Sequence, residues 1–103
     1  MKQRIKTKFG FYLPASVPIG SVEYAVVDRP LRGKRTFGNT DSAKLVIIID
    51  VAKHGSAAEL LQTYEHEIGH AIVSETGYSR PHGELNVEAH MHTQGLVALV
   101  MAQ

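Results

Sequence analysis

The sequence predicts an α+β fold in which a small N-terminal β-sheet of about three strands carries two helices packed on it. Segments rich in β-branched residues fill the first half of the chain, and apolar residues at helical spacing fill the second half. The chain has 103 residues, of which 44% are hydrophobic, and this is enough apolar material for one core. We therefore expect a single domain over residues 1–103.

Three segments of the first half are predicted as strands. Basic and other side chains alternate from Lys2 to Tyr12, which is the period of a half-buried strand. Pro14 and Pro18 are expected to break the chain before a second strand, Val22–Val27. The third strand, Lys44–Asp50, contains a β-branched run and is expected to be covered on both faces.

The segment Asp28–Asn39 is predicted as a loop because it contains Pro30, Gly33 and Gly38. It is also basic, and residues 1–44 hold nine of the 11 lysines and arginines of the chain. Such a half could contact nucleic acid or an acidic partner. No nucleic-acid motif accompanies the charge, which favours solvated strands and loops whose lysines protect a sheet edge.

A helix is predicted from Ala57 to Thr76. Ser56 and Glu59 have the spacing of a capping box, in which Glu59 reaches back to the capping residue. Gly77 stands where a left-handed residue would end the helix. Apolar residues that recur at helical spacing form the stripe expected to face the core: Leu60, Leu61, Tyr64, Ile68, Ala71 and Ile72.

The same helix carries the pentapeptide His66-Glu67-Ile68-Gly69-His70, which has the form HExxH. Residues four apart lie on one side of a helix, so the imidazoles of His66 and His70 can meet one zinc ion at about 2.0–2.1 Å. Glu67 borders the same ion and stays free to take a proton from a water that the metal activates. The pattern therefore predicts His66 and His70 as metal ligands, Glu67 as catalytic base and Zn²⁺ as cofactor.

A catalytic zinc usually takes three protein ligands, so a third residue is expected elsewhere. Residues 78–83 are predicted as a turn, and a last helix is expected from about Glu84 to Met101. Glu84, Glu88 and His92 are spaced by four and lie on one stripe of this helix. The stripe identifies the candidates without choosing between them.

The motif and its surroundings resemble the compact zincin metallopeptidases of the gluzincin type, including the ImmA/IrrE-like group common in phage and mobile-element genomes. The resemblance covers roughly residues 38–99, with a hydrophobic strand leading into the active-site helix and Glu88-Ala89 in the next helix. It implies a minimal zincin-like domain whose third zinc ligand is Glu88.

A second resemblance is to the SprT-like peptidases, in which a histidine before a glycine supplies the third ligand. Here His82 precedes Gly83, twelve residues after His70, a slightly shorter gap than expected. The aromatic residue usual after that glycine is also missing, since Glu84 follows. Glu88 is therefore the first choice, His82 the second and Glu84 the third.

These residues predict a zinc-dependent metallopeptidase that hydrolyses peptide bonds of a peptide or protein substrate. One alternative is a non-catalytic zinc-binding module that regulates or binds another protein on a zincin scaffold, because 103 residues leave little material for a substrate cleft. Another is a structural zinc closed by four ligands, for instance His66, His70, Glu88 and His92.

The composition indicates a cytoplasmic protein. The chain has no cysteine, which fits a reducing compartment, and its net charge is +1. Its first residues are basic but lack the apolar run of a signal peptide. No stretch of 18 apolar residues occurs, so no contact with the membrane interior is expected.

Overall fold

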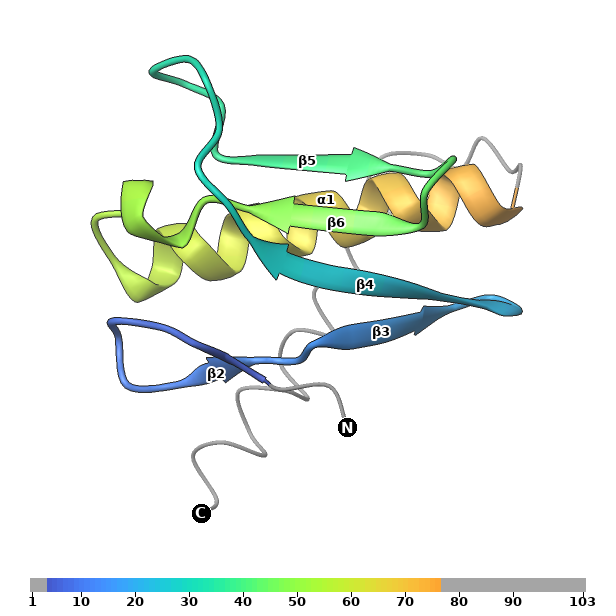
Figure 1. The fold of residues 1–103 in the computed structure, drawn as a ribbon, viewed down its shortest axis with the longest axis horizontal. Helices are drawn as coiled ribbons and strands as arrows, with labels where there is room; N and C mark the ends of the chain where they lie inside the picture. Colours follow the sequence, from blue (N-terminus) through green and yellow to red (C-terminus); the bar gives the residue numbers. More distant parts are fainter. Residues whose placement is uncertain (1–3, 77–103) are drawn as a thin grey trace.

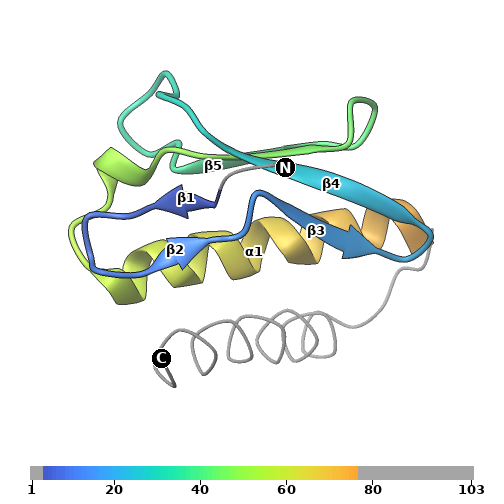
Figure 2. The ribbon, with the colours of Figure 1, turned by 60° about the horizontal axis from the view of Figure 1, so that its bottom comes forward.

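The computed structural model describes residues 4–76, which form an α+β fold of two β-sheets and one long helix (Figure 1). The larger sheet has the strand order β3-β4-β6-β5, and the smaller one pairs β1 with β2. The bounds of the larger sheet's strands are Ser16–Ile19 for β3, Val22–Asp28 for β4, Gly38–Asp41 for β5 and Val46–Ile49 for β6. The helix α1, Ala57–Thr76, lies across one face of this sheet (Figure 2). The α+β class is confirmed, whereas the expected number of about three strands is too low.

The N-terminal segment is a hairpin, so the prediction of one strand from Lys2 to Tyr12 is wrong. Strand β1 (Ile5–Lys6) pairs antiparallel with β2 (Tyr12–Leu13). The chain reverses at Gly10, whose φ of +86° suits glycine. The backbone nitrogen and the hydroxyl of Thr7 both donate to the Phe11 carbonyl, at 3.0 and 2.6 Å. The alternation itself is present, because Thr7 is buried between two exposed lysines.

Strand β3 contains Pro18, where the sequence suggested a break. β3 is an edge strand of the sheet, paired only with β4 among the described strands. The nitrogen of Val26 donates to the Ala15 carbonyl at 2.9 Å, and antiparallel bonds recur at every second residue of the strand. Pro18 therefore lies where a backbone N–H would point away from β4, and its missing donor costs the sheet nothing.

The two central strands, β4 and β6, run parallel and supply much of the core. Both were predicted, from Val22–Val27 and from Lys44–Asp50 respectively. Ile47 and Ile49 are fully buried, and full burial stabilises such side chains by about 1.5–3 kcal/mol each. Val46 and Ile48, on the opposite face, are only partly buried. In residues 4–76, α1 covers one face of β6, not both as expected.

The core lies between this sheet and α1. The helix contributes the stripe that its periodicity predicted, with Leu60, Tyr64, Ile68 and Ala71 buried. The facing sheet residues alternate along their strands, as a period of two requires. They are Val17, Ile19, Tyr24, Val26, Ile47 and Ile49.

Strand β5 was missed, because the sequence Gly38-Asn39-Thr40-Asp41 has low strand propensity and its start was assigned to the loop. It forms through its backbone, which pairs antiparallel with β6. A turn follows at once, in which the Asp41 carboxylate accepts from the nitrogens of Ala43 and Lys44, both at 3.1 Å. Tertiary pairing therefore outweighs local preference here.

The start of α1 at Ala57 agrees with the prediction, and the helix continues to Thr76, the last residue that the structure describes. The nitrogen of Glu59 donates to the Ser56 hydroxyl at 3.2 Å, as a capping box requires. The Glu59 carboxylate accepts from the nitrogen of Gly55 at 3.0 Å, one residue before the expected partner. The predicted turn at residues 78–83 and the helix at 84–101 lie outside the described residues. Within residues 4–76, no helix has both the length and the apolarity needed to cross a bilayer.

Candidate metal and catalytic site

The two histidines of the HExxH motif lie together on the exposed side of α1. Their Nε2 atoms are 2.9 Å apart, and the rings meet edge to face with centroids 4.5 Å apart. This is the convergence that a spacing of four residues predicts for His66 and His70. Both nitrogens point at one place in space next to the helix.

The distance between these nitrogens tests whether the pair fits a metal. Two lone pairs facing each other at 2.9 Å repel, so either a shared proton or a cation belongs between them. Two ligands of a tetrahedral zinc with bonds of about 2.0–2.1 Å would stand about 3.3 Å apart. The imidazoles reach that separation if each ring moves by a few tenths of an ångström, so His66 and His70 fit as two ligands of one ion.

The remaining ligand is not found in the described part of the chain. Within residues 4–76, no group of three histidine, cysteine, aspartate or glutamate side chains could hold a metal ion. The three predicted candidates, Glu88, His82 and Glu84, lie outside the described residues, as does His92. Each of them stays a prediction.

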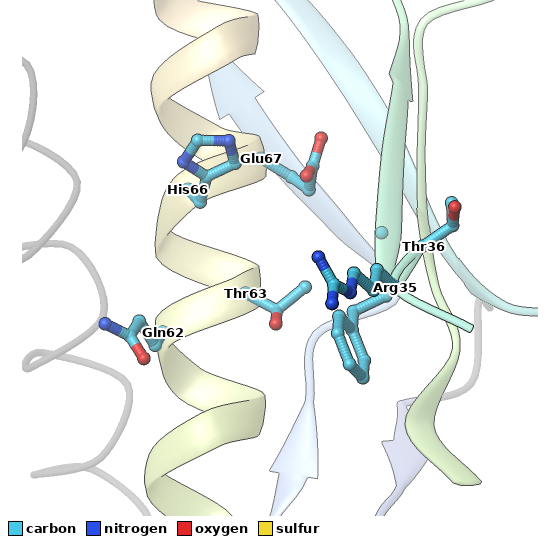
Figure 3. A pocket seen from close by; sticks show the side chains of 8 residues that line it. Arg35, Thr36, Gln62, Thr63, His66 and Glu67 are labelled. Carbon is cyan, nitrogen blue, oxygen red and sulfur yellow. The ribbon is translucent and has the colours of Figure 1, made fainter. Parts of the chain in front are cut away.

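Glu67 follows His66 in the chain but has a different environment. Its side chain extends from α1 toward β5 (Figure 3), and the residue is only 6% exposed. The Thr40 hydroxyl lies 2.7 Å from Glu67 Oε1 and 3.1 Å from the Glu67 carbonyl oxygen. A hydroxyl has one proton, and the shorter contact to the carboxylate fixes one of its two oxygens.

Gly38 allows this approach of β5 to α1. A Cβ atom at residue 38 would lie 2.9 Å from Thr63 Cγ2, 3.0 Å from Glu67 Cγ and 3.2 Å from Glu67 Oε2. The first distance is shorter than carbon atoms tolerate without movement. Glycine at the first position of β5 therefore lets the carboxylate lie against the strand backbone.

Two hollows, each of about 460 Å³, open on either side of Glu67. One lies between residues 35–38 and the α1 residues Gln62, Thr63, His66 and Glu67. The other lies between residues 38–40 and the α1 residues His66, Glu67, His70, Val73 and Ser74. Because both hollows are lined by Gly38, His66 and Glu67, the motif has open space on each side.

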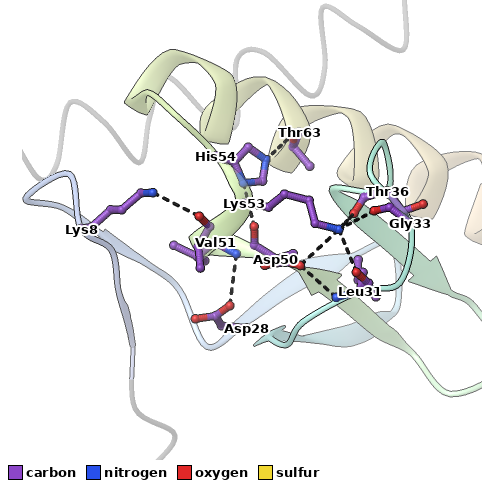
Figure 4. Close-up of polar contacts among 11 residues, drawn as sticks. Lys8, Asp28, Leu31, Gly33, Thr36, Asp50, Val51, Lys53, His54 and Thr63 are labelled. Atoms are coloured by element: carbon purple, nitrogen blue, oxygen red, sulfur yellow. Dashed lines mark hydrogen bonds and ion pairs between the residues drawn. The ribbon is translucent and has the colours of Figure 1, made fainter.

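His54 belongs to the support of this site and had no partner in the sequence pattern. It is buried, its Nδ1 is 2.8 Å from the Asp50 carbonyl oxygen, and its Nε2 is 2.8 Å from the Thr63 hydroxyl (Figure 4). The carbonyl only accepts, so Nδ1 donates to it, while the Thr63 hydroxyl pairs with Nε2. The residue thereby joins the end of β6 to the second turn of α1.

Sequence reasoning found three of the site residues and missed their supports. Thr40 and Gly38 stand on β5, and the neighbouring loop assignment hid their role. One pattern in the sequence could have predicted β5. The turn sequence Asp41–Lys44 stands directly before the β-branched run of β6, and a turn in this place is typical of a hairpin. Thr63 was not singled out because it lies between apolar helix positions.

Comparisons of the chain with protein-family models, with curated proteins and with solved structures give no match. The resemblance to zincins therefore depends on the motif and on the residues around it.

Proposed function

We propose that this protein is a zinc-dependent metallopeptidase built on a minimal zincin-like domain. The observation that carries the proposal is the pairing of two converging imidazoles with a neighbouring carboxylate that the sheet holds in place. Metal ligands alone would fit many kinds of site. A nearly buried carboxylate beside them, held at one oxygen by Thr40 and lining two hollows, is what general-base chemistry requires.

The roles of the residues follow from this arrangement. His66 and His70 would hold the ion, and zinc would supply a Lewis acid that polarises a carbonyl and makes water a nucleophile near neutral pH. Glu67 accepts the proton of that water and delivers it to the leaving amine. Thr40 donates to Oε1 and leaves the second oxygen, beside Gly38, to receive the proton.

The free edge of β5 supports a peptide as the substrate. Among the described strands, β5 is the last of its sheet. The nitrogen of Asp50 donates to the Phe37 carbonyl at 3.0 Å, and the bonds of an antiparallel pair alternate along the strand. The backbone groups of Gly38 and Thr40 consequently face away from β6, where an extended peptide could pair with them beside Glu67.

The third ligand is proposed from the zincin resemblance to be Glu88, with His82 and Glu84 as the alternatives. Zinc affinity should fall by about 10- to 100-fold or more in Glu88→Ala and stay near wild type in His82→Ala, because loss even of a ligand's supporting group costs that much. A competition titration with a chromogenic chelator measures both variants. The reverse order would assign the ligand to His82.

A zinc-binding module without turnover is the other function that the same residues allow. Glu67→Gln separates the two, because the amide keeps the shape but does not accept the proton. The variant should keep its zinc and lose peptidase activity by about two orders of magnitude or more. Glu65→Gln, a half-buried carboxylate on the same helix, is the matched control and should keep its activity. Zinc content is measured by elemental analysis and cleavage with quenched fluorescent peptides. Equal cleavage by Glu67→Gln and wild type would contradict the peptidase proposal.

A further inference from the structure

The loop from Arg29 to Phe37 carries a positive charge that the metal site does not explain. Arg29, Arg32, Lys34 and Arg35 are all exposed in this loop. Of these four residues, only Arg35 lines a hollow of the site. It is the hollow between residues 35–38 and the α1 residues Gln62, Thr63, His66 and Glu67. Figure 3 shows its guanidinium extending into the space between α1 and the start of β5.

The backbone on both sides of Arg35 is fixed by Lys53, as Figure 4 shows. The Lys53 ammonium donates to the carbonyl oxygens of Leu31, Gly33 and Thr36, at 2.8, 2.8 and 2.7 Å. An ammonium has three protons, so these bonds use all of its donors. Lys53 therefore acts as a clamp for the loop and is not available to a ligand.

Asp50 also anchors the loop, next to Lys53. Its Oδ2 accepts from the nitrogen of Leu31 at 2.9 Å and lies 3.4 Å from the Lys53 ammonium. The backbone N–H of Leu31, together with Lys53, lowers the pKa of the Asp50 carboxyl below its ordinary value. Asp50 is thus negatively charged at neutral pH and balances the clamp.

Phe37 closes the loop after Arg35. Its carbonyl accepts from the nitrogen of Asp50 at 3.0 Å, and its ring packs against His54 with centroids 5.3 Å apart. Arg35 thus stands in a loop held before and after it. Within residues 4–76, its own side chain forms no ion pair or hydrogen bond. The fold therefore fixes the backbone of Arg35 at the site, and no group of residues 4–76 binds its guanidinium.

The charges in the hollow predict which group Arg35 would meet. Glu67 has the opposite charge, but it is nearly buried and already accepts from Thr40, so it faces the protein more than the solvent. The guanidinium is exposed, and the neighbouring cations of the loop have the same sign. A carboxylate is the planar group that a guanidinium binds through two parallel hydrogen bonds.

We propose that Arg35 binds a carboxylate of the substrate, so that the enzyme prefers peptides with an acidic residue close to the scissile bond. This inference depends on the proposed peptidase function and adds the substrate class to it. One guanidinium in a hollow of about 460 Å³ fits a single side-chain or terminal carboxylate better than a nucleic-acid backbone, which needs a line of cations.

The test uses the full chain loaded with zinc and a series of quenched fluorescent peptides. The peptides are otherwise neutral and carry one Glu, Gln or Lys, moved through each position around the cleaved bond. At one position, wild type should show kcat/KM about tenfold higher for Glu than for Gln, the effect of one charge-assisted contact. Arg35→Gln should abolish this ratio, and Arg35→Glu should favour Lys. Lys34→Gln, a neighbour outside the hollow, is the control and should keep the ratio.

Three results would overturn the inference. The first is a wild type with no preference for Glu at any position. The second is a preference that Arg35→Gln retains. The third is an equal loss in Lys34→Gln and Arg35→Gln, which would indicate a diffuse field of the loop and not a subsite.

A binding measurement separates this inference from the proposed function. Isothermal titration of the same peptides into zinc-loaded Glu67→Gln gives the ratio of Kd values without cleavage. A ratio that depends on Arg35, found where wild type cleaves nothing, would support the carboxylate subsite and contradict the peptidase. Cleavage by wild type without such a ratio of Kd values would support the peptidase and contradict the carboxylate subsite. A single-stranded oligonucleotide that binds more tightly than any peptide, with all four loop cations contributing alike, would overturn the carboxylate subsite in favour of a nucleic-acid contact.

Discussion

His66 and Glu67 are neighbours in the chain, yet they belong to two differently built sides of the site. His66 and its partner His70 are exposed, and α1 alone determines how they meet. Glu67 is nearly buried, accepts from Thr40 and lies against the backbone of Gly38. One side of the site is supplied by a helix, and the other by the contact between that helix and a strand.

The difference has a physical consequence for each side. Two exposed imidazoles with nitrogens 2.9 Å apart gain stability only when a cation joins them, so the metal side should respond to zinc and to chelators. The base side does not depend on the metal for its position, because the Glu67 carboxylate is held by the hydrogen bond from Thr40 and by packing against Gly38. In the proposed enzyme, the arrangement of His66 and His70 thus depends on the metal, whereas the fold alone positions Glu67.

The largest effect should come from removing both histidines. The double substitution His66→Ala, His70→Ala should abolish zinc binding and the stability that zinc adds, about 3–4 kcal/mol when free zinc exceeds Kd by 100- to 1,000-fold. Thermal unfolding with and without zinc, together with elemental analysis, measures this. In a chelator, variant and wild type should unfold alike, since both histidines are exposed. Stoichiometric zinc in the double variant would refute the metal site.

Gly38→Ala should disturb the base side and the sheet together. The added methyl group would lie 2.9 Å from Thr63 Cγ2 and 3.0 Å from Glu67 Cγ, and such overpacking costs about 1–3 kcal/mol. Loss of freedom in the unfolded chain offsets only about 0.4–1 kcal/mol. The free energy of unfolding in urea should therefore fall by about 1–2 kcal/mol.

Gly55→Ala provides the control for this substitution. A Cβ atom there would lie 3.5 Å from Glu59 Oε2, an ordinary contact, so the variant should be close to neutral. If both glycine variants lose the same stability, the loss reports a general property of glycine and the close approach of β5 to α1 is not its cause.

Thr40→Val tests the hydrogen bond to Glu67 with little change of shape. Peptidase kcat/KM should fall about tenfold, because a hydrogen bond to a charged group contributes roughly that factor. Zinc affinity should not change, since the Thr40 hydroxyl bonds to Glu67 and not to His66 or His70. Thr40→Ser restores the hydroxyl and should recover most of the activity. A fully active Thr40→Val would mean that packing alone positions the carboxylate.

The smallest effect on stability is expected from a substitution of Asp50, which binds the backbone of the loop Arg29–Phe37. Its pKa is lower in the folded protein than the ordinary 3.8, so it contributes stability above about pH 4 and loses it as pH falls through the lowered pKa. Asp50→Asn should cost about 1 kcal/mol at neutral pH, because the amide oxygen still accepts from the nitrogen of Leu31 and only the charge beside Lys53 is lost. Urea unfolding at about pH 7 and about pH 3 should show a smaller pH dependence in the variant. An unchanged pH dependence would assign the acid sensitivity to other carboxylates.

Local patterns in the sequence were sufficient wherever one element decides the outcome. The start of α1 follows from Ser56 and Glu59, its buried face follows from the apolar stripe, and the convergence of His66 with His70 follows from the helical period. The run that became β6 was recognisable because β-branched residues suit a buried strand in almost any context.

The strands at both edges of the sheet were not recognisable in the same way. Pro18 suggested a break, but at an edge it lacks a donor only on the side that has no partner. The residues Gly38 and Thr40 have little strand propensity, and they become β5 because β6 offers a backbone ladder. Whether such a segment forms a strand depends on the neighbouring strand with which it pairs, and a local pattern does not include that strand.

The sequence by itself therefore determined the helix, the histidine pair and the presence of a carboxylate beside it, because these depend on residues within four positions of each other. Only the tertiary structure decided that Glu67 is buried against Thr40 and that Arg35 shares its hollow. Those contacts join residues 27 or more positions apart. Their formation depends on sheet pairing and on the clamp of Lys53, and neither has a periodicity that a local pattern would reveal.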